Sequence, residues 1–518
     1  MPVSPTAKPL TVKEFDQAKS GVCGGCSASC GYIAYFKEKE LVDLYGHPHD
    51  PNGIGSFCTK GITYVQQLPK NPLRITKPLL RKGSDFKEVS WKEAKEVLGD
   101  SLKGKVAFFF DRFSGLEEYL IAKKLTSEVF TDSVYLPFKS SSVRPQKWVE
   151  KKAILVFEAE PTFSEVMLSR WIVDAFERGA YILSVGSRFT TVFQKASERV
   201  LTTPDETVRI LEGISQGNYE ERVVKLLELL GEEVQVIVGD TLLKSPFKSK
   251  VLNAVKRIRE RFGSDYTFVG NITPFETKEL REFLERIQEF DTLILFGNPF
   301  VYLRSPEVLE GKRIINFAYF PTITANYSTL VIPRTTFAER EFVNKGVGFL
   351  AYSSQILENE FPNPYELLSE VTGISPKVEE FLENFGISLE DLKKAEGGVS
   401  IKGKDIKEFS FEPEEELSSD YWLLCDNTLT EDLGHWNPWT HALEREQFAF
   451  VSKKTKEELG LKEEIEINGV MLKLKVNNNI ADRVIFVPNS FEEFQPFEPG
   501  IRVGRLMKKP YYRFEEFP

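Results

Sequence analysis

Four of the five cysteines in this sequence lie near its start, at Cys23, Cys26, Cys30 and Cys58. Their spacing is Cys-x2-Cys-x3-Cys-x27-Cys. Three thiolates within eight residues can surround three corners of an iron–sulfur cubane, and a distant fourth can close the site. Two glycines directly after Cys23 let the backbone turn tightly before the second cysteine. The spacing therefore predicts one [4Fe-4S] cluster bound by all four side chains.

Two other interpretations of these cysteines stay open. A four-cysteine zinc site is usually built from two matched Cys-x2-Cys pairs, and the second pair is missing here. A disulfide framework spreads its cysteines along a small secreted chain, whereas these are clustered and no apolar secretion signal precedes them. An iron–sulfur site is the interpretation that the ligand spacing favours.

Lys60 follows Cys58 by two residues and is a candidate electron-path residue. A lysine beside a cluster stabilises the reduced, more negative state of that cluster and raises its potential. The alternative is an ordinary solvated surface lysine.

The composition excludes several classes of function. The chain has 518 residues with 67 Lys and Arg against 77 Asp and Glu, a net charge of −10. An acidic chain is not expected to bind nucleic acid or an anionic membrane through a broad basic face. No apolar run approaches the roughly 20 residues that span a bilayer. We expect no direct membrane span and no nucleic-acid partner.

The rest of the chain alternates short apolar runs with amphipathic stretches, as βαβ units around a parallel sheet do. At least six such strands between 105 and 335 indicate two α/β halves. Later, Asn468-Gly469 between two apolar runs predicts a hairpin in a mainly β region. The expected divisions are 1–75 for the Fe-S cluster domain, 76–138 plus 231–350 for a discontinuous α/β domain, 139–230 for an inserted α/β domain, 351–419 for an acidic connecting segment and 420–518 for the β domain.

The N-terminal motifs resemble those of the molybdopterin oxidoreductase superfamily. The cysteine spacing, the CTKG sequence at Cys58 and the stretch PLLRKGSDFKEVSWKEA resemble its start. LILFGNPF resembles its Gly-x-Asn-Pro turn, and TLVIPRTTFAEREFVNKG its late strand and acidic turn. The resemblance implies an α/β protein with an N-terminal [4Fe-4S] domain, two Rossmann-like α/β domains and a C-terminal β-barrel domain.

Three departures from this family concern its pterin cofactor. Active members place a Cys, selenocysteine, Ser or Asp on the metal, where this chain offers only the run Ser140, Ser141 and Ser142. The dinucleotide clamp reads Pro204-Asp205-Glu206-Thr207, which puts carboxylates where diphosphates would lie. A late Glu-Gly-Arg element is reduced to Lys345-Gly346-Val347. These departures predict a scaffold that has kept the cluster, binds no molybdopterin guanine dinucleotide and has no catalytic residue of its own.

Within the superfamily, the chain is most similar to the molybdopterin-like portion of the G-type subunit of bacterial respiratory complex I (NADH:quinone oxidoreductase). This similarity implies an iron–sulfur subunit of a peripheral arm. Its partners would be a ferredoxin-like Fe-S subunit and an FMN/NADH-binding subunit, and it would be cytoplasmic, held at the inner face of the cell membrane through those partners. Two alternatives stay open: an active Mo/W-bis-pterin oxidoreductase, such as a formate dehydrogenase-like enzyme or oxyanion reductase, and a zinc-stabilised scaffold without a redox role.

Overall fold

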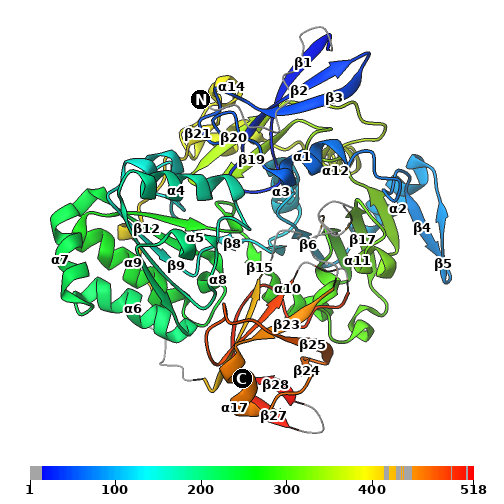
Figure 1. Cartoon of the computed structure of the whole chain (residues 1–518). Helices are drawn as coiled ribbons and strands as arrows, with labels where there is room; N and C mark the ends of the chain where they lie inside the picture. Colours follow the sequence, from blue (N-terminus) through cyan, green and yellow to red (C-terminus); the bar gives the residue numbers. More distant parts are fainter. Residues whose placement is uncertain are drawn as a thin grey trace.

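The computed structural model of the chain contains two α/β bodies side by side, a small β unit above them and a barrel below (Figure 1). The structure describes residues 15–412, 419–426, 433, 436, 446–489, 491, 493–508 and 512–517. The expected connecting segment includes residues 413–418, which lie outside this set. None of the described helices combines the length and the apolar character that crossing a bilayer requires.

The cysteines lie in the small β unit, which is a three-stranded antiparallel sheet followed by a helix. Its elements are β1 (Gln17–Val22), β2 (Gly31–Lys37), β3 (Glu40–Gly46) and α1 (Thr59–Gln66). Cys23, Cys26 and Cys30 lie on the β1–β2 connection, and Cys58 directly precedes α1. The sheet therefore brings the first three thiols to the same end as the start of α1.

The first α/β body is built on an eight-stranded sheet. In spatial order its strands are β15 (Lys278–Glu279), β7 (Val129–Thr131), β6 (Val106–Phe110), β16 (Thr292–Phe296), β17 (Arg313–Ala318), β18 (Leu330–Pro333), β4 (Leu79–Lys82) and β5 (Asp85–Glu88). The central strands are parallel and fully buried, which is why they read as continuous apolar runs. Its helices include α2 (Trp91–Ser101), α3 (Leu116–Leu125), α10 (Leu280–Arg286) and α11 (Ile323–Tyr327).

The second α/β body has a five-stranded parallel sheet. In spatial order its strands are β11 (Glu198–Leu201), β10 (Tyr181–Gly186), β9 (Ala153–Phe157), β12 (Val234–Gly239) and β13 (Asp265–Val269). Its helices are α4 (Ser169–Glu177), α5 (Thr191–Lys195), α6 (Pro204–Gln216), α7 (Glu221–Leu230), α8 (Asp240–Leu243) and α9 (Lys248–Phe262).

The expected domain division at residue 231 is corrected by this sheet. β12 and β13 were expected in the discontinuous domain, but both pair within the five-stranded sheet. The chain runs outward from β9 through β10 to β11 and then returns to the opposite side of β9. Apolar periodicity identifies a strand but does not tell which sheet it joins, so the sequence placed this division too early.

The expectation for 351–419, an acidic connecting segment, is also corrected. Much of this segment is folded into helices that pack on the eight-stranded body. It contains α12 (Pro364–Thr372), α13 (Val378–Glu383) and α14 (Leu389–Lys394). Their apolar side chains Leu367, Leu382 and Leu392 are buried in the core of the eight-stranded body. Each helix is short and charge-rich on its outer face, so its composition resembles that of a solvated segment.

The C-terminal region forms a closed barrel, as the resemblance implied. Its strands in spatial order are β22 (Tyr421–Asp426), β26 (Val484–Pro488), β23 (Phe448–Val451), β25 (Val470–Val476), β24 (Glu464–Ile467), β28 (Tyr512–Glu516) and β27 (Gly500–Lys508). Asn468 and Gly469 join β24 to β25 with φ of 50° and 80°, which confirms the predicted two-residue hairpin. The fifth cysteine, Cys425, is buried in the barrel core.

Candidate metal centre

The four cysteines predicted as ligands occupy one end of the β1–β2 sheet. The N–H of Cys23 donates to the carbonyl of Cys30 at 2.9 Å and closes the loop that carries the first three thiols. Cys58 is the N-cap of α1, where its Sγ accepts from the N–H of Gly61 at 3.5 Å. A helix N-terminus stabilises a thiolate, so this position suits a metal ligand.

Burial opposes ionisation of three of these thiols, Cys23, Cys26 and Cys30. Burial raises the pKa of Cys23 and of Cys30, and the neighbouring sulfurs Cys26 and Cys58 raise both further. Burial likewise raises the pKa of Cys26 to about 12. Four thiolates at one place, two of them buried, require positive charge among them, and the iron of a cubane would supply it. The donor set therefore fits a four-iron cluster.

Within the described ranges, no three His, Cys, Asp or Glu side chains are grouped as ligands of one metal ion. The cysteines nevertheless lie close enough for Cys26 and Cys58 to raise the pKa of both Cys23 and Cys30. The sequence left three interpretations: a zinc site, a disulfide framework and an iron–sulfur cluster. Of these, the cluster is the one in which each thiolate binds a separate corner of a cubane.

Both α/β bodies hold the loop that carries Cys23, Cys26 and Cys30. Asn344 lies on β19 (Phe342–Gly346), a strand of a separate three-stranded sheet whose Val343 is buried in the core of the eight-stranded body. Its amide donates to the carbonyl of Cys23 at 3.1 Å and to Ser29 Oγ at 2.8 Å. From the five-stranded body, Glu165 accepts from Ser27 Oγ at 2.8 Å. The loop therefore bridges the two bodies, and its shape depends on both.

Lys60, the candidate electron-path residue, lies on α1 and is buried. Its Nζ donates to the carbonyls of Phe163 at 2.8 Å and Ser164 at 3.3 Å. Its positive charge lowers the pKa of Cys26, opposing the effect of burial. The ammonium thus lies between the thiols and the boundary of the five-stranded body, and it is not the solvated surface lysine of the alternative interpretation.

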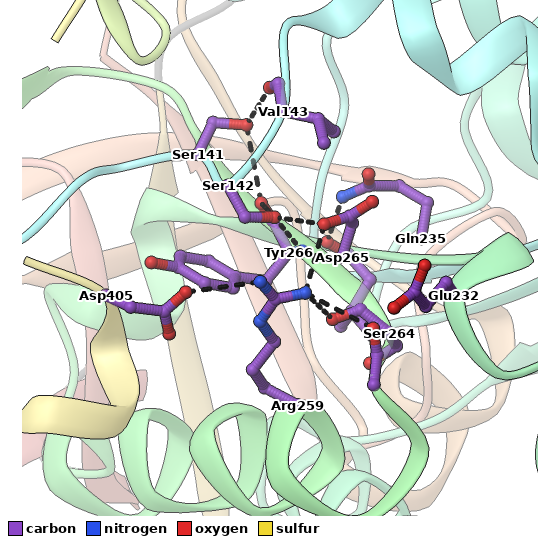
Figure 2. Close-up of polar contacts among 12 residues, drawn as sticks. Ser141, Ser142, Val143, Glu232, Gln235, Arg259, Ser264, Asp265, Tyr266 and Asp405 are labelled. Atoms are coloured by element: carbon purple, nitrogen blue, oxygen red, sulfur yellow. Dashed lines mark hydrogen bonds and ion pairs between the residues drawn. The ribbon is translucent and has the colours of Figure 1, made fainter. Parts of the chain in front are cut away.

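The serine run considered for a metal ligand is used in structural contacts instead (Figure 2). Ser141 Oγ lies 2.6 Å from the hydroxyl of Thr267 and 2.5 Å from the carbonyl of Val143. Ser142 Oγ donates to Asp265 at 2.8 Å, and Ser140 Oγ accepts from a backbone N–H at 3.1 Å. The hydroxyls of Ser141 and Ser142 attach the chain to the edge strand β13, and that of Ser140 contacts Gly348.

Ligands of open α/β sheets bind where the strand order reverses, at the carboxyl ends of the strands. In the five-stranded sheet this point lies between β9 and β12, which are directly followed by Glu158 and Asp240. Burial raises the pKa of Glu158 to about 6. The cavity beside these residues measures about 30 Å³ and is also lined by Glu160 and Asp426.

The pterin cofactor of the superfamily does not fit this cleft. A second cavity, next to Cys26 and Arg112, measures about 10 Å³. Cavities for drug-sized ligands measure roughly 300–1,000 Å³, and a bis-pterin dinucleotide is larger than such a ligand. The carboxylates at the first cavity would also repel its diphosphates. Among the described residues, this part of the molecule is filled by the protein's own side chains.

The two remaining departures noted in the sequence have structural partners. Asp205 and Glu206 lie in the first turn of α6, where both pair with Arg209. Lys345 Nζ donates to Ser133 Oγ at 2.7 Å, and the N–H of Val347 donates to the carbonyl of Ser27 at 3.0 Å. The residues of both departures therefore contact other parts of the protein. Val347 makes its contact at the cysteine loop.

Sequence reasoning did not identify Glu165, Asn344 or Glu158. Asn344 and Glu165 contact the cysteine loop across 321 and 138 residues of chain. No local motif marks such contacts. Glu158 follows an apolar strand directly, and this position at a strand end is a signal that could have indicated it.

We expect Glu158→Gln to stabilise the protein at neutral pH. Because the folded state raises the pKa of Glu158 from its usual value near 4.5 to about 6, folding binds the proton. The stabilisation that proton binding at Glu158 contributes is therefore present below pH 4.5, and it is lost as the pH rises through about 6. The variant should gain about 2 kcal/mol at pH 7 and less than about 0.5 kcal/mol at pH 4.5. Urea unfolding at both pH values measures this, with the exposed Glu307→Gln as control; an equal gain at both values contradicts it.

Comparison with known proteins gives a family and a fold. Residues 74–345 match the family described as molybdopterin oxidoreductase. The F420-dependent formate dehydrogenase 2 subunit alpha of Methanococcus maripaludis is 24% identical over 231 residues, covering 39% of this chain and 34% of that protein. A nitrate reductase of Symbiobacterium thermophilum is 30% identical over 132 residues, covering 24% of this chain and 17% of that protein. Each match thus spans about a third or less of the relative's length.

The overall architecture matches a solved structure more completely. Acetylene hydratase from Pelobacter acetylenicus aligns with a TM-score of 0.66 at 13% identity, covering 91% of this chain and 93% of that one. At this identity the match establishes a shared fold and nothing about the reaction. The mixed α/β architecture with its C-terminal barrel is therefore that of the acetylene hydratase structure.

Proposed function

Since this chain belongs to the molybdopterin oxidoreductase family, we propose that it is an iron–sulfur subunit of a multi-subunit oxidoreductase. Cys23, Cys26, Cys30 and Cys58 would hold one [4Fe-4S] cluster, which supplies one-electron chemistry when bound. The chain's own residues would position that cluster and carry out no bond-making step. The formate dehydrogenase relatives are named as alpha subunits, which supports a role within a larger assembly.

The observation that carries this proposal is the closed, acidic cleft beside an intact set of thiols. The two cleft cavities measure about 30 and 10 Å³, and four carboxylates line the larger one. Arg188 pairs with Asp426 and Lys244 with Asp240, so these pairs are neutral as a whole. The other charged residues lining the larger cavity are Glu158, Glu160 and Arg112, which leaves it acidic on balance. A protein with this interior can keep a cluster without a place for an anionic bis-pterin.

The finer assignment that we propose is the peripheral arm of a complex I-like NADH:quinone oxidoreductase. A ferredoxin-like Fe-S subunit and an FMN/NADH-binding subunit would be its partners. Loss of the pterin with retention of the fold is what supports this assignment. Neither the formate dehydrogenase nor the nitrate reductase is a complex I subunit, so the assignment depends on the cleft and the cysteines alone.

A second candidate is an active Mo/W-bis-pterin oxidoreductase of the formate dehydrogenase type. The names of the relatives favour this candidate over the complex I assignment. In that enzyme Lys60 would lie on the electron path between cluster and pterin, in keeping with its contacts to Phe163 and Ser164 at the cleft. The small cavities oppose it.

Elemental analysis of anaerobically purified protein separates the two candidates. We expect about four iron and four sulfide per chain and neither molybdenum nor tungsten above background. About one Mo or W per chain would instead establish the second candidate. Zinc in place of iron would exclude a redox role altogether. Co-purification with the two named kinds of partner tests the complex I assignment separately.

A further inference from the structure

Glu165 places a buried carboxylate beside the cysteine loop. Its side chain is 2% exposed. The Oε1 atom accepts from Ser27 Oγ at 2.8 Å and from the N–H of Gly270 at 3.0 Å. The Oε2 atom accepts from the hydroxyl of Ser164 at 2.5 Å. All three partners donate, which is the arrangement that an ionised carboxylate requires.

This carboxylate forms no ion pair with a described residue. A buried carboxylate is usually paired with a cation, whereas the three donors to Glu165 are neutral groups. Burial raises the pKa of Glu165, and the hydroxyls of Ser164 and Ser27 lower it. Two charges act on it from further away, since Asp240 raises its pKa and Arg112 lowers it. The ionised side chain therefore keeps a negative charge that its direct partners do not cancel.

That charge lies next to Cys26. Glu165 and Cys26 line the same cavity, which measures about 10 Å³, so little space separates the elements that carry them. Ser27, a hydrogen-bond partner of Glu165, directly follows Cys26 in the chain. Glu165 raises the pKa of Cys26, whereas Lys60 lowers it. Two opposite charges therefore act on the same sulfur.

Lys60 and Glu165 reach this position from different parts of the chain and meet at one short segment. The Lys60 Nζ donates to the carbonyls of Phe163 and Ser164, and Glu165 is the next residue. A cation beside a cluster stabilises the reduced, more negative state, and an anion destabilises that state. The two side chains should therefore shift a reduction potential in opposite directions.

We propose that Glu165 helps to set the potential of the cluster: its carboxylate charge, next to Cys26, lowers the reduction potential that Lys60 raises. This inference rests on the proposed function, which places a [4Fe-4S] cluster on the four cysteines. Reduction adds one electron to the cluster, and the carboxylate repels that added charge. Lys60 and Glu165 together would then determine which electron carriers can reduce the cluster.

A redox titration followed by EPR tests this proposal on the full chain, purified anaerobically and held at about pH 8 to favour the ionised carboxylate. Glu165→Gln keeps an acceptor for Ser27 and Gly270 but removes the charge. We expect its equilibrium constant for reduction to rise about tenfold, which is about 59 mV for a one-electron couple. Glu165→Asp keeps the charge and should retain most of the unaltered potential.

The matched control is Glu177→Gln, which removes an exposed carboxylate at the end of α4. Solvent screens that charge, so the control should keep the unaltered potential. Four results would each overturn the role of Glu165: an unchanged or lower potential in Glu165→Gln, an equal shift in Glu165→Asp, an equal shift in the control, or loss of the cluster from Glu165→Gln. Absence of iron, sulfide and an EPR signal from the unaltered protein would instead overturn the proposed function, and this inference with it.

Discussion

Cys58→Ser should lose most of its iron and sulfide together with its visible absorption. Cys58 comes 28 residues after the three other thiols and closes the site from the start of α1. A serine hydroxyl does not ionise at neutral pH and binds iron far more weakly than a thiolate. Iron and sulfide assays on anaerobically purified protein, with the EPR signal of the reduced form, measure the loss.

The matched control for that variant is Cys425→Ala. Cys425 is the one cysteine outside the N-terminal group, and it is fully buried in the barrel core. Its removal should leave the iron content and the EPR signal unchanged. A Cys58→Ser protein that keeps its full brown colour would remove the basis of the cluster assignment.

Arg334→Met should destabilise the eight-stranded body severely. Arg334 is fully buried, and its guanidinium binds Asp111 with two contacts, of 2.7 and 2.8 Å. The variant would leave the Asp111 carboxylate buried without its cation, which costs about 3–5 kcal/mol. The thermal transition of this body should fall by roughly 6–20 °C.

Differential scanning calorimetry measures that fall, and Arg222→Met serves as its control. Arg222 pairs with Glu198 at 2.7 Å, but its side chain is 68% exposed to solvent. Exposed pairs contribute little, so the control should unfold at the temperature of the unaltered protein. Equal shifts in the two variants would mean that burial does not govern the strength of these pairs.

The sequence predicted what depends on neighbouring residues. The ligand spacing and the β24–β25 hairpin at Asn468-Gly469 are both set locally, by a few adjacent side chains. Strands such as β9 were recognisable because a strand buried on both faces is apolar at every position.

What the sequence did not predict depends on contacts between distant parts of the chain. The assignment of β12 to the five-stranded sheet follows from its pairing with β9, about 80 residues earlier. The contacts that hold the cysteine loop come from Asn344 and Glu165, which belong to different bodies. The helices α13 and α14 each bury few apolar residues. Their many charged residues are why the sequence predicted an acidic connecting segment over 351–419.

The double attachment of the cysteine loop has a consequence for the biogenesis of the protein. Cys23 is 5% exposed and Cys30 is 4% exposed in the finished fold. Asn344, which holds this loop, is synthesised long after the thiols. If the proposed cluster is bound, iron and sulfide would reach Cys23 and Cys30 more easily before Asn344 docks on the loop than in the finished fold.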